Sequence, residues 1–319
     1  MADKQALNAT FFVFQKRERG GVLLGATLAY LVLVFAIFGV FAALNWCGVT
    51  EYYAWIATMS QNYDPTNATT MTPPASVMAL VPAYFLLMLV SYILLAAYEA
   101  ACLRWMIRGE TKGLFGLSLG ADTWRVYAGY WMWFLLLVAA YIVCGIIAVV
   151  FLGSIFAAGS TGDPSAVTSI GFAAPVLFLV ALLALAFFAV RLAPAAATSI
   201  ARKKFAFFDA WTVTKGRFWA LLGSFVMLWL MYFVAVVLLT FGIVAAIGAG
   251  AGAGTQALDP NASPEQIMAI FTSPQVLGPV LAIYALILVA AFVWVLALFG
   301  INARAAQAAL EEGKITPAA

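Results

Sequence analysis

The chain has 319 residues, of which 66% are apolar and 9% are charged, and its formal net charge at pH 7 is +3. A typical soluble domain carries roughly 25% charged residues, so a chain of this composition cannot hide its apolar surface in a soluble fold. A soluble globular enzyme is therefore excluded. The sequence contains no histidine, which removes the commonest general base and the commonest ligand of haem, zinc and copper.

The apolar residues form six long blocks. In chain order they cover about 22–45, 77–102, 126–152, 172–195, 218–249 and 276–303. Each block is long enough to cross a hydrocarbon core of ~30 Å at the 1.5 Å rise of an α-helix. The first block exceeds the apolar region of a signal peptide, so we expect it to be a retained membrane helix. The sequence predicts an all-α, polytopic bundle of six transmembrane helices.

The charged residues are segregated between the two sets of loops. All 16 basic residues lie before the first block, between the second and third, around the gap between the fourth and fifth, or after the sixth. The other three loops, about 46–76, 153–171 and 250–275, carry acidic residues and no base. The positive-inside rule then predicts that both termini are cytoplasmic, in a multi-pass protein of a bacterial inner membrane. The same bases can also attract anionic lipid headgroups.

Three features recur along the chain in the same order. Each acidic loop contains an Asp-Pro pair, at Asp64, Asp163 and Asp259, separated by 99 and 96 residues. A proline then follows near the start of the next block, at Pro82, Pro175 and Pro279. The basic approach to each odd-numbered block is also similar. These repeats predict one membrane domain of three parallel hairpins, 1–102, 103–195 and 196–303, followed by a cytoplasmic tail, 304–319.

The three aspartates have two possible roles. Asp followed by Pro is a common start of a helix, with Asp as the N-cap, and we interpret Asp64, Asp163 and Asp259 as helix caps. A shared Ca²⁺ site is the alternative, because carboxylate oxygens suit that ion. The run that begins at Ser263 also has capping residues and predicts a short helix over about 264–272. We expect no metal site.

Two basic segments, about 103–124 and 198–216, mix bases, aromatic residues and small polar residues. We interpret them as amphipathic helices in the cytoplasmic interface, with a plain connecting loop as the alternative. In either case their bases are candidates for contact with anionic lipid. The residues concerned are Arg104, Arg108, Arg125, Arg202, Lys203, Lys204, Lys215 and Arg217.

Two ionisable residues lie inside predicted spans, where charge is costly and usually functional. Glu99 follows Pro82 by 17 residues and Arg191 follows Pro175 by 16, so the repeat places them at nearly the same depth. We predict that Glu99 and Arg191 form an intramembrane ion pair. This pair is either a structural clamp between hairpins or a site that couples a proton or a substrate.

No pattern of catalytic residues is found in the sequence. A Ser-His dyad cannot form without histidine, and no phosphate-binding loop with its lysine and serine occurs. The three cysteines do not form a CxxC motif, and their odd number argues against a disulfide framework. We expect no catalytic residues, no cofactor and no nucleic-acid partner.

One segment resembles a known family. Residues 205–223, FAFFDAWTVTKGRFWALLG, follow the basic segment RLAPAAATSIARKK at 191–204. Together they are similar to bacterial six-span proteins of the glycerophosphoryl diester phosphodiesterase membrane-domain-like and YciC-like group. The resemblance implies an inner-membrane bundle. No segment matches the soluble phosphodiesterase barrel of the fused members, so no catalytic residue is carried over.

Taken together, these patterns predict a non-catalytic inner-membrane protein. We expect a structural or accessory subunit of a membrane complex, or a protein that organises lipid. Its partners would be anionic lipids of the inner leaflet and a second membrane protein or another copy of itself. The alternative is a transporter or channel for a lipid-like or small hydrophobic molecule. An intramembrane enzyme is a third option.

Overall fold

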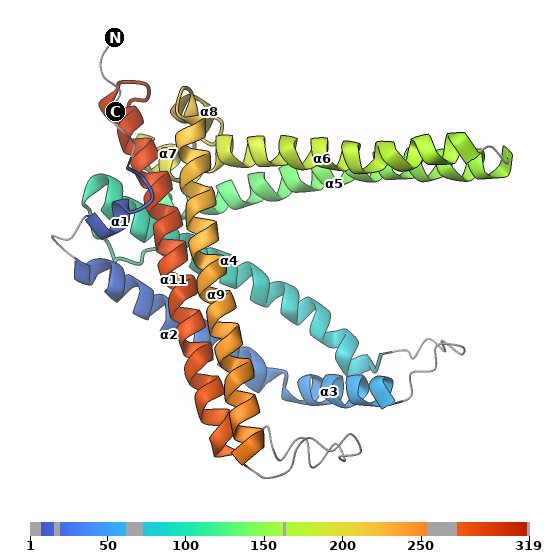
Figure 1. Ribbon diagram of the computed structural model, residues 1–319. Coiled ribbons are helices and arrows are strands. Elements are labelled where there is room, and N and C mark those ends of the chain that lie inside the picture. The colour runs from blue at the N-terminus through green and yellow to red at the C-terminus, as the bar shows by residue number, and fades with distance from the viewer. Residues whose placement is uncertain (1–7, 16–19, 62–72, 162–163, 254–272, 318–319) are drawn as a thin grey trace. The chain divides into compact units, whose positions relative to one another are not determined.

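The computed structural model describes residues 8–15, 20–61, 73–161, 164–253 and 273–317 (Figure 1). These residues are helical apart from short connections, and no β-strand occurs among them. The helices follow one another along the chain as α1 (Phe12–Gln15), α2 (Gly20–Leu44), α3 (Trp46–Gln61), α4 (Ala75–Arg108), α5 (Ala121–Thr161), α6 (Pro164–Leu192), α7 (Ala195–Arg202), α8 (Ala210–Thr214), α9 (Phe218–Ala253) and α11 (Pro274–Glu311).

The six predicted spans are confirmed as helices. Helices α2, α4, α5, α6, α9 and α11 each contain a segment long and apolar enough to cross a membrane. Each of these helices contains an apolar stretch of 18 residues, and no more than 11% of the residues in that stretch are buried. Monomeric soluble proteins rarely expose apolar patches larger than a few hundred Å². The helices therefore fit a multi-pass membrane protein.

The chain divides into two compact units. One unit contains residues 18–177 and 199–207, which include α2 to α5. In it α4 packs against α2, α3 and α5. Tyr98 of α4 stacks on Tyr30 of α2 with ring centroids 4.7 Å apart, and its hydroxyl lies 2.8 Å from the Thr27 hydroxyl. The carboxyl-terminal third of α4 is the most deeply buried part of this unit.

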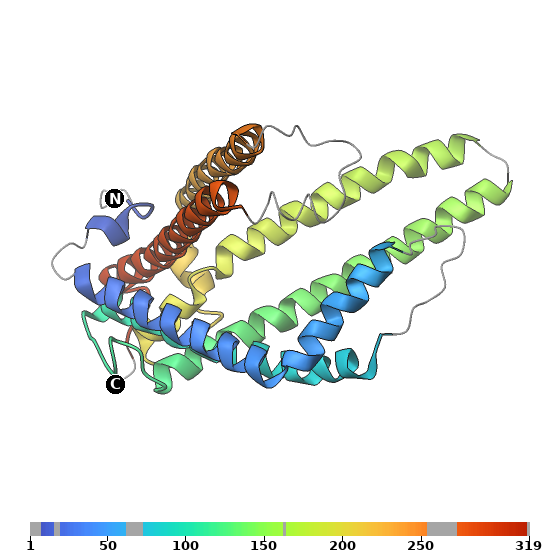
Figure 2. The same cartoon turned by 90° about the horizontal axis from the view of Figure 1, so that it is seen from below.

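The other unit contains residues 1–17, 178–198 and 208–316. Its main feature is the pair α9 and α11, which lie side by side in both views (Figures 1 and 2). Tyr232 of α9 stacks on Trp294 of α11 at 5.1 Å. Helix α1 packs on α11 where Gly300 has no side chain, since a Cβ there would lie 3.0 Å from that of Val13.

The predicted proline positions differ from the structure in one respect. We expected Pro82 and Pro279 in the first turns of their spans, where a missing N–H has no intrahelical acceptor. Helix α4 begins at Ala75 and α11 at Pro274, so both prolines lie inside helices. Membrane helices tolerate interior proline because neighbouring groups can satisfy the freed carbonyl. The predicted caps Asp64, Asp163 and Asp259 and the predicted helix 264–272 lie outside the described residues.

The segment 103–124 is not one helix. Helix α4 continues to Arg108, and α5 already begins at Ala121, so only residues 109–120 form a connection. Gly109 stops α4 in the left-handed conformation, with φ of 67°, and its N–H donates to the Trp105 carbonyl. The segment 198–216 contains the end of α7, a connection and α8. Both basic segments thus include loops where a continuous interfacial helix was the first interpretation.

Candidate anion-binding site

The loop 109–120 brings the basic end of α4 next to the start of α5. It turns at Gly113 and Gly116, whose φ angles are +79° and +90°, and the Leu117 N–H donates to the Leu114 carbonyl at 3.0 Å. A Cβ on Gly113 would lie 1.9 Å from the Leu117 carbonyl oxygen. Only glycine therefore fits this position, and the loop has a defined shape.

Phe115 lies at the tip of this loop in a strained conformation. Its φ is +52°, a left-handed value that costs an ordinary side chain roughly 1–2 kcal/mol. The Phe115 side chain is nevertheless largely exposed, as are those of Leu114 and Leu119. The tip of the loop is therefore apolar and faces outward.

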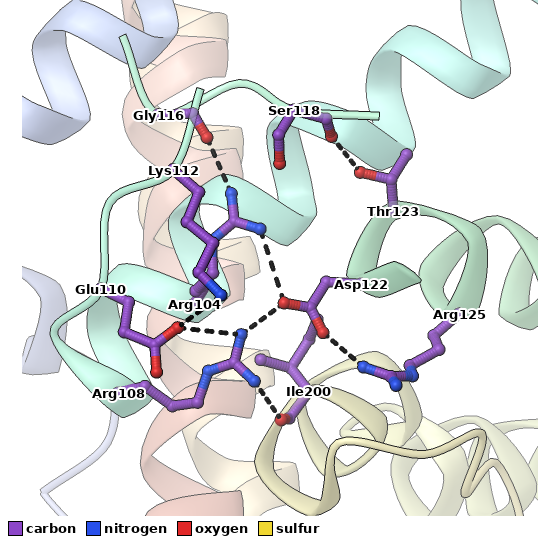
Figure 3. A network of polar contacts seen from close by, with 10 residues as sticks. All are labelled: Arg104, Arg108, Glu110, Lys112, Gly116, Ser118, Asp122, Thr123, Arg125 and Ile200. Carbon is purple, nitrogen blue, oxygen red and sulfur yellow. Dashed lines mark hydrogen bonds and ion pairs between the residues drawn. The ribbon is translucent and has the colours of Figure 1, made fainter. Parts of the chain in front are cut away.

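Three arginines converge on one carboxylate at the base of the loop (Figure 3). We call Arg104, Arg108, Arg125 and Asp122 the arginine cluster. The Arg104 Nη1 lies 3.5 Å from Asp122 Oδ2, which the Arg108 Nη2 also contacts. The Arg125 Nη1 lies 2.6 Å from the second oxygen, Oδ1. Asp122 thus holds together three cations that would otherwise repel one another.

The sequence places these groups together for simple geometric reasons. Arg104 and Arg108 are four residues apart on α4 and so share one helix face. Asp122 lies in the first turn of α5, where the helix dipole favours an acid, and Arg125 follows it by three residues. The tight loop then brings the two helix ends into contact.

Arg104 is the most enclosed member of the arginine cluster. Its side chain is 2% exposed, and its Nη2 donates to the Gly116 carbonyl at 2.8 Å. Its Nε has no hydrogen-bond partner in the described part of the chain, and the same is true of the Arg108 Nε. Buried polar groups are normally paired, so these two Nε atoms are exceptions within the described residues.

A cavity of about 290 Å³ opens beside the arginine cluster. We call it the basic cavity. Its basic lining residues are Arg104, Arg108, Lys112, Arg125 and Lys203. Its acidic lining residues are Glu110 and Asp122. Three positive charges therefore remain in excess, and the chemistry of the donors suits an anion such as a phosphate group.

The structure gathers half of the predicted lipid-contact residues around this cavity. Arg104, Arg108, Arg125 and Lys203 line it, but Arg104 is too buried to lie on a lipid-facing surface. Lys204 is exposed and lies outside the cavity lining, as does Arg202.

Arg217 and Lys215 belong to the other unit. There Arg217 forms an ion pair with Glu312, and the Lys314 ammonium donates to the Lys215 carbonyl at 3.2 Å. These contacts hold the end of α11 against the connection between α8 and α9.

The members of the predicted intramembrane pair have separate surroundings. Glu99 is buried and accepts a hydrogen bond from the Tyr130 hydroxyl at 2.5 Å. The Arg191 guanidinium lies over the rings of Phe187, Trp211 and Phe218, at 5.3, 5.1 and 5.4 Å from their centroids. The two residues lie in different units, and their pairing stays a prediction.

Sequence reasoning missed two features of these sites. It did not identify Asp122 as the shared partner of the arginines, although the Asp122–Arg125 spacing of three was a usable signal. It also missed the aromatic residues around Arg191, which come from three separate helices and leave no local pattern. In comparisons with family models, curated proteins and solved structures, no match to this chain is found.

Proposed function

We propose that this chain is a non-catalytic, multi-pass protein of the bacterial inner membrane that organises anionic lipid, alone or as an accessory subunit of a membrane complex. The observation that carries the proposal is the basic cavity, with three excess positive charges at the adjoining ends of two spans. Helix ends lie at the depth of lipid headgroups when the helix crosses a bilayer. Bases at that depth attract anionic headgroups.

The distribution of charge along the chain supports the same proposal. In the predicted orientation, both termini and every basic segment face the cytoplasm. The arrangement of three parallel hairpins and the kinship with the YciC-like group belong to this proposal as well. A protein of this kind would concentrate anionic lipid on its cytoplasmic side without changing it chemically.

Purification in a mild detergent, followed by mass spectrometry of the bound lipids and proteins, tests the proposal. We expect anionic phospholipids to be enriched over their share of the source membrane. A second membrane protein in fixed ratio would support the accessory role. If the bound lipids have the same composition as the membrane, the proposal is wrong.

Transport of a lipid-like molecule is the alternative, and one observation favours it. An apolar groove of about 620 Å³ lies between α2, Leu94 and Ala97 of α4, and the loop 109–120. We call it the apolar groove. Protein reconstituted in vesicles would then accelerate the movement of labelled lipid between leaflets. Vesicles that scramble lipid no faster than protein-free vesicles would exclude this alternative.

A further inference from the structure

The basic cavity and the apolar groove lie next to each other on the same unit. The groove is lined by residues of α2, including Gly25 and Leu28, by Leu94 and Ala97 of α4, and by the tip of the loop. Ser118 lines both the groove and the cavity. A polar compartment and an apolar compartment therefore share one wall, which is the arrangement that a molecule with a charged head and a hydrocarbon chain requires.

Two hydrogen bonds attach the loop to α4 and α5 just after its apolar tip at Phe115. The Arg104 guanidinium donates to the Gly116 carbonyl, and the Thr123 hydroxyl donates to the Ser118 carbonyl (Figure 3). The position of the tip relative to the basic cavity is therefore determined by hydrogen bonds. On the groove side, Phe115 lies close to Gly25, where a Cβ would be 3.7 Å from the Phe115 Cδ1.

We propose that this pair of compartments binds one anionic phospholipid, with its phosphate in the basic cavity and a hydrocarbon chain in the apolar groove. The inference deepens the proposed function and rests on it. The phosphate reduces the excess of three positive charges in the lining of the cavity.

The same charge balance discriminates between lipids. A zwitterionic headgroup brings a cation toward a cavity that is already positive, and like charges repel. A free phosphate ion satisfies the cavity but leaves the groove empty, with Leu114 and Phe115 exposed. The structure therefore favours an anionic phospholipid over a zwitterionic one and over inorganic phosphate.

Lys112 and Lys203 are the residues of choice for a test, because both line the basic cavity and neither contacts Asp122 in the described structure. Binding of phosphatidylglycerol and of phosphatidylcholine to the full chain would be titrated in detergent and read by native mass spectrometry. Each base near a headgroup strengthens binding about fivefold. The double variant Lys112→Gln/Lys203→Gln should therefore bind phosphatidylglycerol about 25-fold more weakly.

Lys204→Gln is the matched control, because Lys204 adjoins Lys203 in sequence but does not line the cavity. It should change binding less than twofold. Phe115→Asn tests the groove, since asparagine tolerates the left-handed backbone and removes the apolar side chain. It should weaken phosphatidylglycerol binding, whereas Leu24→Asn, on the same unit but outside the groove lining, should not.

Three results would overturn the inference, in distinguishable ways. If the wild-type chain prefers anionic lipid but the double variant binds it like Lys204→Gln, the site is wrong and the proposed function survives. If Phe115→Asn binds normally and millimolar inorganic phosphate displaces the lipid, the cavity is a site for free phosphate. If the wild-type chain shows no preference for phosphatidylglycerol, the proposed function fails too. If the double variant does not fold, the single variant Lys203→Gln replaces it in the test and should bind phosphatidylglycerol about fivefold more weakly.

Discussion

Replacing Asp122 by asparagine should destabilise the unit that contains α4 and α5. The substitution preserves the size of the side chain but removes the one negative charge on which Arg104, Arg108 and Arg125 converge. The Asp122 side chain is 9% exposed and that of Arg104 is 2% exposed, so water that enters from the basic cavity compensates for the lost carboxylate only in part.

The size of the effect follows from this burial. Removing one partner of a buried ion pair costs about 3–5 kcal/mol. We expect about 3 kcal/mol here, the lower end of that range, because the amide oxygen of asparagine still accepts hydrogen bonds and Arg125 is partly exposed. At 2–4 °C per kcal/mol, the melting temperature in detergent should fall by roughly 6–12 °C.

The assay is thermal unfolding of the detergent-purified chain, followed by loss of the monodisperse peak on size exclusion. The matched control is Glu110→Gln, the same chemical change in the same cavity lining. Glu110 is 37% exposed and contacts Arg108 and Lys112 at 3.6 and 3.4 Å, so it should cost no more than about 1 kcal/mol. If the two variants melt at the same temperature, Asp122 does not hold the arginines together.

Three further predictions concern other parts of the chain. Gly113→Ala should disrupt the loop 109–120, because its Cβ would collide with the Leu117 carbonyl. Gly109→Ala has only the cost of its positive φ, since it meets no atom within 4 Å, and should disrupt the loop less; equal proteolysis of the loop in the two variants would contradict this. Glu99→Leu should cost about 1–3 kcal/mol by leaving the Tyr130 hydroxyl without its acceptor, whereas Glu99→Gln, which keeps an acceptor, should cost less in thermal unfolding. Equal losses would instead indicate that the charge of Glu99 matters, as the predicted ion pair with Arg191 requires. The Lys314 ammonium and then the Arg217 guanidinium lower the pKa of the Glu312 carboxyl. The stabilisation is therefore present above the ordinary carboxyl pKa of about 4.3 and is lost as the pH falls through the lowered value. The wild-type chain should thus be up to about 1 kcal/mol more stable than Glu312→Gln at pH 7, and a difference that persists at pH 2 would refute the assignment.

The six spans could be predicted from the sequence because each one depends on local information. A helix that crosses lipid satisfies its backbone hydrogen bonds within its own segment, so length and hydropathy are sufficient to find it. The segregation of the 16 bases into alternate loops is likewise a property of the sequence. The same local logic showed that Glu99 and Arg191 are unusual residues, without showing their surroundings.

The arginine cluster could not be predicted in the same way. Arg104 and Asp122 are separated by 18 residues, and whether they meet depends on where the chain turns between them. That turn depends on Gly113 and Gly116, and the need for glycine at Gly113 is visible only once the Leu117 carbonyl is seen to fill the space where its Cβ would lie. The mixed basic, aromatic and small polar composition of residues 103–124 is compatible with either an interfacial helix or a loop. Tertiary structure decided for the loop, because packing α4 against α5 brings opposite charges together only if the chain reverses sharply between them.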